Sequence, residues 1–483
     1  MAARSWQLIS TPAPAPPWRW WLPGVAGALA WLDARGLGEG RRIGLSAGNL
    51  PACAALLQAA PLAGLTTVLF NRRLSPAALA GQLRASACDA LVVGPGAPGP
   101  ATVADTVDAP RVHALPEEFP AQASHPPLAP LAGGQAALVL YSSGTGGPPK
   151  AVRLSMAAVG AAAAAAVARL ALGRGDHWLG CLPLDHIGGA SVVLRAGLCG
   201  YALTLVERFD APTVDQLLEH GITGISVVPT MLQRLVSERA GRAWPAPLRT
   251  LLTGGAPLAC ALGEATARLG LTACETYGLT EAASQVCTSA PAAAAIGSCG
   301  EPLPGVRVRL RTSAGAPVER GNGGLIEIAG ATLFDGYEQG GELVQPHPAG
   351  AWFATGDIGM LDDAGRLSVQ GRSDDMINSG GEKINPAEIE AVLEAYPGIL
   401  EAGVYGERDA QWGERVAAVV VARGARPNAA ALQAWCAERL GSFRCPRSWR
   451  FAESLPRTAA GKLQRRRLAG WPPPEADPSD RSA

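Results

Sequence analysis

Lysine is scarce in this chain. Its 483 residues contain 41 lysines and arginines together, and only Lys150, Lys383 and Lys462 are lysines. Arginine therefore supplies the ordinary surface cations, and the three lysines mark positions where a compact, rotatable ammonium has a chemical task. All three lie in segments that contain glycine. Each lysine is therefore a candidate site residue.

The chain also lacks a charge excess, paired cysteines and a long apolar run. Its 41 acidic residues balance 41 basic ones, which argues against a nucleic-acid or anionic-membrane partner, so small-molecule ligands are expected. The ten cysteines contain no C-x-x-C pair, which excludes the usual zinc pattern and favours buried thiols in a reducing cytoplasm. Residues 156–172 are mostly alanine and carry Arg169, so they predict a packed helix and no membrane span. The first 22 residues show no secretion signal. The sequence leaves open whether the protein forms a homo-oligomer.

The most informative stretch is a loop rich in glycine and hydroxyl groups that follows the apolar run 136–140. It reads Tyr-Ser-Ser-Gly-Thr-Gly-Gly-Pro-Pro-Lys from Tyr141 to Lys150. Glycines let main-chain N–H groups approach oxyanions, hydroxyls add donors, and the lysine adds a point charge. The spacing differs from G-x-x-x-x-G-K-[ST], so it predicts another kind of nucleotide loop, or else an ordinary strand-to-helix connection. The candidate phosphate-binding residues are Ser142, Ser143, Gly144, Thr145, Gly146, Gly147 and Lys150.

The first part of the chain alternates helical segments with short apolar runs. This rhythm predicts layered α/β structure with a parallel sheet. The predicted helices cover 25–37, 51–60 and 75–87, and the predicted strands cover 42–46, 66–70 and 90–93. Residues 94–130 are rich in Pro, Ala and Gly and are expected to form a surface connection. Further strands are predicted at 178–183, 201–206, 225–228 and 249–253, the last of which leads into Gly254, Gly255 and Ala256.

The pattern changes in the last third of the chain. Short alternating strands with glycine turns over 296–370 predict a small β-barrel, and 376–469 shows a compact α+β pattern. The predicted organisation is a large N-terminal domain over 1–373, a small mobile C-terminal domain over 374–470, and a hinge where they join. The tail 471–483 is rich in Pro, Asp and Ser and is predicted to be disordered.

Three other segments carry side chains suited to ligands. Tyr277 could stack on a base, Thr280 could donate to a phosphate, and Glu281 could hold Mg²⁺ through hard oxygen atoms. The alternative for this segment is a strand followed by a capped helix. His186 follows a predicted strand, where it faces a pocket or is an ordinary loop residue. Asp357 is either a turn residue or an acceptor for paired ribose hydroxyls.

Taken together, these segments resemble the adenylate-forming superfamily of acyl-CoA ligases, peptide-synthetase adenylation domains and luciferases. The resemblance covers nearly the whole chain and includes all three lysines. The superfamily's motifs occur in its order at 141–150, 277–281, 355–357, 371–374, 380–383 and 456–462. Gly146 and Ala151 depart from the usual residues of the phosphate loop, but they leave Lys150 and the main-chain donors in place.

The resemblance implies ATP, Mg²⁺ and CoA as cofactors. It implies that Tyr277 stacks on adenine beside Gly254 to Ala256, that Asp357 and Arg372 bind ribose, and that Glu281 binds Mg²⁺ near Thr280. Lys462 would contact the acid carboxylate and the α-phosphate during adenylation. The C-terminal domain would then pivot at Asp374 for the thioester step. That pivot would bring in a CoA-binding loop made by Ser379, Gly380, Gly381 and Lys383.

Within the superfamily the chain looks most like the o-succinylbenzoate:CoA ligases of menaquinone biosynthesis, through 183–195, 276–288 and 379–390. That acid carries a second carboxylate on its ring, for which Arg195 is the candidate partner, unless Arg195 snorkels from a surface helix. His186, Ser284 and Gln285 are expected to line the same pocket. Another aryl or aliphatic acid, a stand-alone adenylation domain that loads a carrier protein, and a non-catalytic scaffold remain as alternatives.

Overall fold

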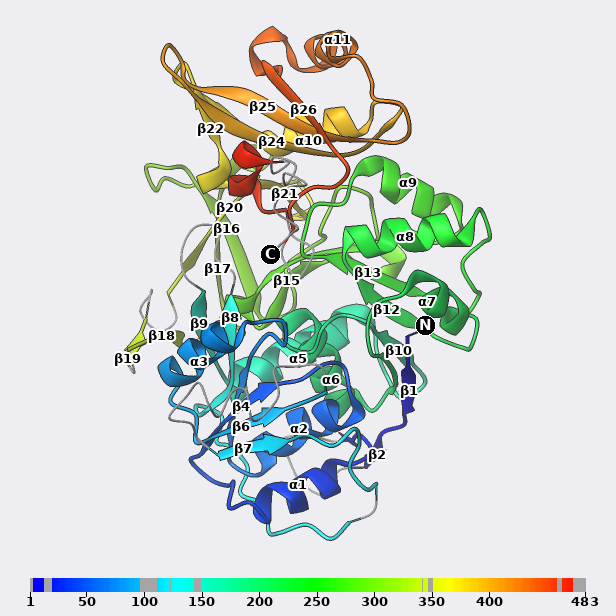
Figure 1. The fold of residues 1–483 in the computed structure, drawn as a ribbon, viewed down its shortest axis with the longest axis vertical. Coiled ribbons are helices and arrows are strands. Elements are labelled where there is room, and N and C mark those ends of the chain that lie inside the picture. The colour runs from blue at the N-terminus through cyan, green and yellow to red at the C-terminus, as the bar shows by residue number, and fades with distance from the viewer. Residues whose placement is uncertain are drawn as a thin grey trace, which may run out of the picture. The chain divides into compact units, whose positions relative to one another are not determined.

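The computed structural model describes residues 3–12, 20–95, 111–121, 123–142, 149–340, 342–345, 351–457 and 463–471 (Figure 1). The chain divides into two compact units, which are described separately. The first unit comprises Met1–Leu258, Gly263–Val308 and Ile328–Phe353, and the second comprises Ala259–Leu262, Arg309–Glu327 and Ala354–Ala483. The domain boundary predicted at Asp374 stays a prediction, and the predicted tail lies, from residue 472 on, outside the described residues.

The first unit contains an eight-stranded sheet whose centre is parallel. Strands β4, β5, β6, β7 and β8 pair in parallel, whereas β8–β9, β9–β18 and β18–β19 pair antiparallel. The order across the sheet is β19 (Glu342–Val344), β18 (Gly336–Gln339), β9 (Lys150–Ser155), β8 (Ala136–Ser142), β5 (Thr66–Leu69), β4 (Arg42–Ser46), β6 (Ala90–Val93) and β7 (Arg111–Ala114).

A second, seven-stranded sheet belongs to the same unit. Its inner strands β10 to β14 pair in parallel, and β1 and β15 close its two edges with antiparallel pairing. A two-stranded ribbon, β2 (Thr11–Pro12) with β3 (Trp20–Trp21), stands apart from both sheets. The order is β1 (Ser5–Leu8), β11 (Ala202–Val206), β10 (His177–Gly180), β12 (Gly224–Val227), β13 (Thr250–Gly254), β14 (Cys274–Leu279) and β15 (Ser284–Thr288).

Helices α5 and α6 form the layer between these sheets. Helix α5 contacts β8 and β9 of one sheet and β15 of the other, and α6 packs on α5, α2, β10, β11 and β15 (Figure 1). Ser155 caps the start of helix α5, because its hydroxyl accepts a hydrogen bond from the Ala158 N–H at 3.2 Å. The helical segments are α1 (Val25–Asp33), α2 (Pro51–Leu62), α3 (Pro76–Ala85), α5 (Met156–Leu170), α6 (Ile187–Cys199), α7 (Ala211–Leu218), α8 (Pro229–Arg239), α9 (Cys260–Arg268), η1 (Thr280–Ala282) and η2 (Pro291–Ala293).

The second unit holds most of a four-stranded sheet and all of a five-stranded sheet. The first of these runs in the order β16 (Val306–Arg311), β17 (Gly323–Gly330), β20 (Phe353–Leu361) and β21 (Leu367–Arg372). The other runs β23 (Glu382–Ile384), β22 (Ile377–Ser379), β25 (Gly413–Ala422) and β24 (Ile399–Asp409), with β26 (Ser448–Ala452) also on β25. The remaining segments are η3 (Ser373–Asp375), α10 (Pro386–Glu394), α11 (Ala429–Leu440), η4 (Ser442–Arg444) and η5 (Arg465–Gly470).

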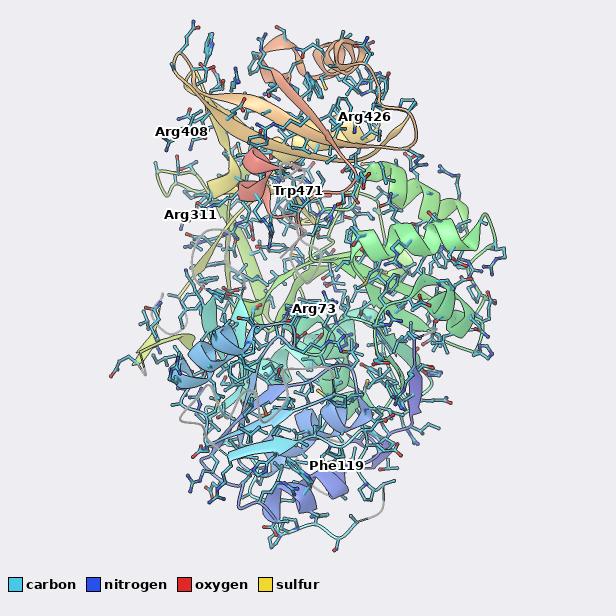
Figure 2. All side chains as sticks on the ribbon, in the orientation of Figure 1. Arg73, Phe119, Arg311, Arg408, Arg426 and Trp471 are labelled. Carbon is cyan, nitrogen blue, oxygen red and sulfur yellow. The ribbon has the colours of Figure 1, made fainter. Side chains whose placement is uncertain are left out.

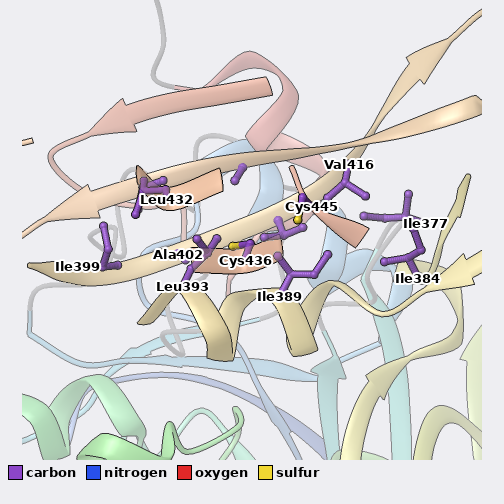
Figure 3. Close-up of a cluster of buried hydrophobic side chains, with 13 residues drawn as sticks. Ile377, Ile384, Ile389, Leu393, Ile399, Ala402, Val416, Leu432, Cys436 and Cys445 are labelled. Atoms are coloured by element: carbon purple, nitrogen blue, oxygen red, sulfur yellow. The ribbon is translucent and has the colours of Figure 1, made fainter. Parts of the chain in front are cut away.

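The five-stranded sheet is buried on both faces because its strands alternate between two cores. Val416 and Val420 of β25 pack with Ile389 and Leu393 of α10 on one face (Figure 3). Val419, on the opposite face, packs with a separate cluster around Leu455 and Leu468. A side-chain period of two therefore lets one strand serve both cores. At the end of the described chain the Trp471 indole donates to the Ser454 carbonyl at 2.7 Å (Figure 2).

The layered α/β class predicted from the sequence is confirmed, and the predicted small barrel corresponds to the four-stranded sheet of β16, β17, β20 and β21. The expectation of a simple surface connection over 94–130 is wrong in part. Residues 111–114 form β7, and Phe119 is buried against Trp31 of α1, with ring centroids 5.8 Å apart (Figure 2). Across the described residues, each helix is too short or too polar to cross a membrane.

Candidate active site

A pocket in the first unit lies between α5, α6 and the turn that precedes β15. The α5 residues lie on one face of the helix, at intervals of three and four, and most are alanines. That face is therefore apolar, and its side chains are small. The α6 residues repeat with similar spacing, but they add a hydroxyl and a guanidinium. The lining residues are Val159, Ala162, Ala163, Ala166, Ile187, Ser191, Leu194, Arg195, Ala283, Ser284 and Gln285.

Arg195 is a buried cation at this pocket. Its exposed fraction is 1%, and its guanidinium carbon lies 5.1 Å from the centre of the Trp178 ring. Within the described part of the chain, its Nε and Nη2 atoms have no hydrogen-bond partner, and no carboxylate forms an ion pair with it. The alternative that Arg195 snorkels to the surface is therefore wrong, because α6 is packed between two sheets. A buried, unpaired guanidinium is a strong reason to expect an anionic ligand.

Gln285 holds one side of that guanidinium. Its amide oxygen accepts from Arg195 Nη1 at 3.1 Å, and its amide nitrogen donates to the Thr288 hydroxyl at 2.8 Å. Thr288 and Thr276 share a hydrogen bond of 2.8 Å, so the orientation of the amide is fixed from behind. Arg195, Ser284 and Gln285 thus line one pocket in the structure, and their role in binding an acid stays a prediction.

The turn before β15 has an uncommon backbone. Ala283 and Ser284 have φ angles of 53° and 114°, a region that non-glycine residues seldom adopt. A Cβ atom on Gly278 would overlap the Ser284 carbonyl oxygen, so the two backbones meet only because residue 278 is glycine. This close approach coincides with a register shift between Tyr277 and Gly278. The strained turn directs Ser284 and Gln285 to the pocket.

His186 lies at the start of α6, where it is the residue before the first helical turn. Its Nε2 is 3.9 Å from Asp185 Oδ1, and both atoms are buried without a hydrogen-bond partner among the described residues. Burial raises the pKa of Asp185, and the charge of His186 opposes that rise. Gly189 lets the helix start directly against the Pro183 carbonyl, where a Cβ would clash. His186 therefore borders the pocket helix, and its proposed role stays a prediction.

The predicted phosphate loop connects β8 with β9. Ser142 and Lys150 are opposite each other in the antiparallel register, and the Ser142 hydroxyl lies 3.5 Å from the Lys150 carbonyl. The strand pair therefore brings both ends of the loop together. Ser143, Gly144, Thr145, Gly146 and Gly147 lie outside the described residues.

The predicted adenine site follows from two neighbouring parallel strands. Gly254 at the end of β13 pairs with Thr276 of β14, and a Cβ on Gly254 would lie 2.6 Å from the Thr276 methyl group. Gly255 has a φ of 82°, which turns the chain away just beside Tyr277. The end of β13, with Gly254 and Gly255, thus lies beside the strand that carries Tyr277. Adenine binding there stays a prediction.

Glu281 carries the carboxylate predicted for Mg²⁺. It lies in the single 3-10 turn η1 with Thr280, so the alternative of a capped helix at this position is wrong. Its Oε1 accepts from the Tyr337 hydroxyl at 2.9 Å, and its Oε2 has no hydrogen bond within the described ranges. No group of three or more His, Cys, Asp or Glu side chains that could hold a metal ion is found in those ranges. One carboxylate with a free oxygen fits Mg²⁺, which commonly takes few protein ligands and completes its shell with phosphate and water.

The predicted ribose site lies in the second unit, on the hairpin of β20 and β21. Asp357 and Arg372 are opposite each other, and Arg372 Nη1 donates to the Asp357 carboxylate at 3.1 Å and to the Thr355 carbonyl at 3.2 Å. Gly356 has a φ of 76° and brings the backbone close to the same guanidinium. The carboxylate is thus held by a charge-assisted hydrogen bond.

The predicted CoA loop is a tight hairpin between β22 and β23. Gly380 and Gly381 have φ angles of 61° and 89°, which is the geometry of a two-residue turn with both central residues left-handed. Lys383 follows on the exposed side of β23, and Ser379 ends β22. Asp374, the predicted hinge, is exposed in η3. Lys462 lies outside the described residues.

Tyr337 is the main site residue that sequence analysis missed. It lies on β18, and its ring and hydroxyl contact Lys150 and Glu281. The available signal was scarcity: the chain has only six tyrosines, and the argument used for lysine applies to them as well. Ser191 and the alanine stripe of α5 were also missed, because nothing local distinguishes pocket alanines from packing alanines.

Two family profiles match this chain. The AMP-binding enzyme profile covers residues 26–338, and the AMP-binding enzyme C-terminal domain profile covers residues 388–462. The chain therefore belongs to the AMP-binding enzyme family, which confirms the resemblance to adenylate-forming enzymes.

Similar proteins share a narrower description. The chain is 33% identical to a 2-succinylbenzoate–CoA ligase of Bacillus cereus, across 92% of this chain and 91% of that protein. It is 39% identical to the enzyme of that name from Geobacillus kaustophilus over 69% of each chain. Among solved structures, it resembles the o-succinylbenzoate CoA synthetase of Bacillus subtilis in complex with its acyl-adenylate (TM-score 0.82, 29% identity, 92% and 91% coverage). It also resembles ATP-bound MatB of Rhodopseudomonas palustris (TM-score 0.83, 27% identity, 92% and 91% coverage).

Proposed function

We propose that this protein is an ATP-dependent acid:CoA ligase and that its acid is 2-succinylbenzoate, which is also called o-succinylbenzoate. Family membership supports the adenylate-forming chemistry, and the relatives named as 2-succinylbenzoate–CoA ligases support the acid. The proposal assigns the protein to menaquinone biosynthesis in the cytoplasm, a compartment with which its ten free cysteines agree.

The observation that carries the choice of acid is the buried guanidinium of Arg195, the one charged side chain among the described lining residues of the pocket. A simple fatty acid or benzoate presents one carboxylate, and that group must reach the nucleotide. 2-Succinylbenzoate presents a second one that is not activated, and this group suits Arg195 together with the hydroxyls of Ser191 and Ser284. The alanine stripe of α5 supplies an apolar wall against which the ring could pack.

In the first half-reaction a carboxylate oxygen bonds to the α-phosphorus of ATP, and the bond to the bridging oxygen breaks so that pyrophosphate leaves. We assign Lys150, the phosphate loop and Lys462 to neutralising the phosphate charge, Tyr277 to the adenine, and Asp357 with Arg372 to the ribose. Mg²⁺, when bound to Glu281, supplies further charge neutralisation.

In the second half-reaction the CoA sulfur bonds to the acyl carbon, the bond from that carbon to AMP breaks, and the thiol proton is released. We assign the hairpin with Ser379, Gly380, Gly381 and Lys383 to this step, after a rotation at Asp374. His186 directly precedes Ile187, which lines the pocket, and is assigned to acid binding. These roles follow the motif positions of the family.

The proposal is tested with the full-length protein, ATP, Mg²⁺ and CoA against four acids: 2-succinylbenzoate, 4-oxo-4-phenylbutanoate, benzoate and octanoate. Pyrophosphate release measures adenylation, and mass spectrometry measures the thioester. We expect 2-succinylbenzoate to have the highest kcat/KM, with 4-oxo-4-phenylbutanoate lower because it lacks only the ring carboxylate.

Two results would contradict the proposal. Faster turnover of octanoate or benzoate would show that the acid is wrong. Acid-dependent pyrophosphate release without a CoA thioester would instead indicate an adenylation domain that loads a carrier protein.

A further inference from the structure

Tyr337 lies between the two charged groups assigned to the phosphates and the metal. The Lys150 ammonium is 4.9 Å from the centre of the Tyr337 ring, so it faces the electron-rich face of the ring. The Tyr337 hydroxyl donates to Glu281 Oε1 at 2.9 Å. One side chain thus contacts both charged groups. The cation lies over the electron-rich ring face, and the carboxylate accepts from the hydroxyl hydrogen.

The position of Tyr337 is fixed by its strand. On one side, Arg42 of β4 forms a two-pronged ion pair with Glu338, with distances of 3.1 and 2.7 Å. On the other side, the Phe334 ring packs edge-on against Tyr337, with centroids 4.9 Å apart. The Phe334 N–H in turn donates to the Glu281 carbonyl at 2.9 Å. The ring is therefore held in place independently of Lys150.

Lys150 and Glu281 both contact Tyr337, but no ion pair between them is present in the described part of the chain. The contact of the ammonium with the ring is weaker than the hydrogen bond from the hydroxyl to the carboxylate. The ammonium can therefore leave the ring for a phosphate at little cost, while the carboxylate stays oriented.

We propose that Tyr337 is a positioning residue that keeps Lys150 and Glu281 apart. The ammonium then remains available to phosphate, and the second oxygen of Glu281 remains available to Mg²⁺. This inference rests on the proposed function, because it concerns the same ATP site. It adds a residue that prevents the two charges from neutralising each other before the nucleotide binds.

The test measures binding of ATP by isothermal titration calorimetry in the full-length protein, with and without Mg²⁺ and without acid. Tyr337→Phe keeps the ring and removes the hydroxyl, so metal-free ATP should bind as in the wild type. The factor by which Mg²⁺ increases the affinity for ATP should fall about tenfold. Tyr337→Leu removes both contacts and lets the charges pair, so both affinities should fall about tenfold or more. Tyr405→Phe is the matched control, because that buried hydroxyl has no partner among the described residues.

The decisive variant is the double substitution Tyr337→Leu with Glu281→Gln. If direct pairing is what blocks the lysine, removal of the carboxylate charge must restore the affinity for metal-free ATP toward the wild-type value. A merely structural loss would not be rescued in this way. Wild-type affinity in Tyr337→Leu, or no rescue in the double variant, overturns the inference. If Tyr337→Leu does not fold, an unchanged Mg²⁺ gain in Tyr337→Phe overturns it. Absence of ATP binding by the wild-type protein would overturn the proposed function as well.

Discussion

The guanidinium of Arg195 and the side-chain amide of Gln285 are joined by a hydrogen bond of 3.1 Å in the buried wall of the proposed acid pocket. The amide is neutral, so it orients the arginine without cancelling its charge. Its own orientation is fixed by Thr288. The pocket therefore holds a positive charge that an anionic ligand can neutralise.

Arg195→Met should lower kcat/KM for 2-succinylbenzoate by about 30-fold or more, because a buried charge contact is worth about 2–5 kcal/mol. The analogue 4-oxo-4-phenylbutanoate, which has no ring carboxylate, should be turned over equally well by the variant and the wild type. Steady-state kinetics with both acids check this. A parallel loss with both acids would mean that Arg195 supports the fold of the pocket and does not bind the second carboxylate.

Gln285→Glu should raise KM for 2-succinylbenzoate by about tenfold, because the new carboxylate would pair with Arg195 and compete with the ligand. Gln285→Met removes the hydrogen bond but adds no charge, so its effect should be smaller. The measurement is the KM of each variant for 2-succinylbenzoate. Because the two variants differ in charge, the difference between their KM values reports the effect of that charge. Equal KM values would argue that charge neutralisation is unimportant at this position.

Lys462→Ala should lower the rate of adenylation by about 10²-fold or more, as expected when a preorganised charge contact to a transition state is lost. Thioester formation from a supplied acyl-adenylate should continue. Lys383→Ala, the matched lysine variant, should show the reverse: thioester formation should slow while adenylation continues. Single-turnover assays of each half-reaction measure both. The same loss in both steps would contradict a mechanism with two conformations.

Gly278→Ala should destabilise the protein by about 1–3 kcal/mol and weaken acid binding, because the added methyl group overlaps the Ser284 carbonyl and moves the strained turn. Gly160→Ala is the control. It adds a methyl group to α5, where a Cβ meets nothing within 4 Å, and should stabilise the helix by about 0.5–1 kcal/mol. Urea unfolding gives both values, and a neutral Gly278→Ala would show that the turn can relax.

Glu394→Gln should flatten the pH dependence of stability in the second unit. Burial raises the pKa of Glu394 to about 7, and the Ala402 N–H that donates to it opposes the rise. The folded state therefore holds a proton that the unfolded chain releases near its ordinary pKa, so this group's contribution is lost as the pH rises toward about 7. A tenfold change in proton affinity is worth about 1.4 kcal/mol, so the loss between pH 5 and 8 is about 2 kcal/mol.

The measurement is hydrogen exchange of peptides from α10 and β24 at several pH values. Glutamine keeps an oxygen that can accept from Ala402, and it does not ionise. As the pH rises, we expect the wild type to lose protection from hydrogen exchange faster than the variant. Identical pH profiles would show that Glu394 does not titrate in this range.

Much of this site could be predicted from the sequence because its residues lie in short, chemically unusual stretches. Lys150 was evident from its scarcity, and Glu281 from its place beside Tyr277 and Thr280. Contacts between distant stretches left no local trace. Tyr337 reaches Glu281 only because β18 joins β9, and neither strand's sequence encodes that pairing. The burial of Arg195 likewise depends on α6 lying between two sheets, so a single helix could not distinguish a pocket cation from a surface one.

The pairing of β18 with β9 also sets an order of assembly. Residues 336–339 supply a strand to a sheet whose other paired strands, apart from β19, lie before residue 156. During synthesis, β9 must therefore remain an open edge until nearly two hundred further residues have emerged, and contacts of such long sequence separation form slowly. An exposed edge strand is a template for pairing with other chains. Ribosome-bound or truncated chains that end before β18 should thus aggregate more readily than chains that end just after it.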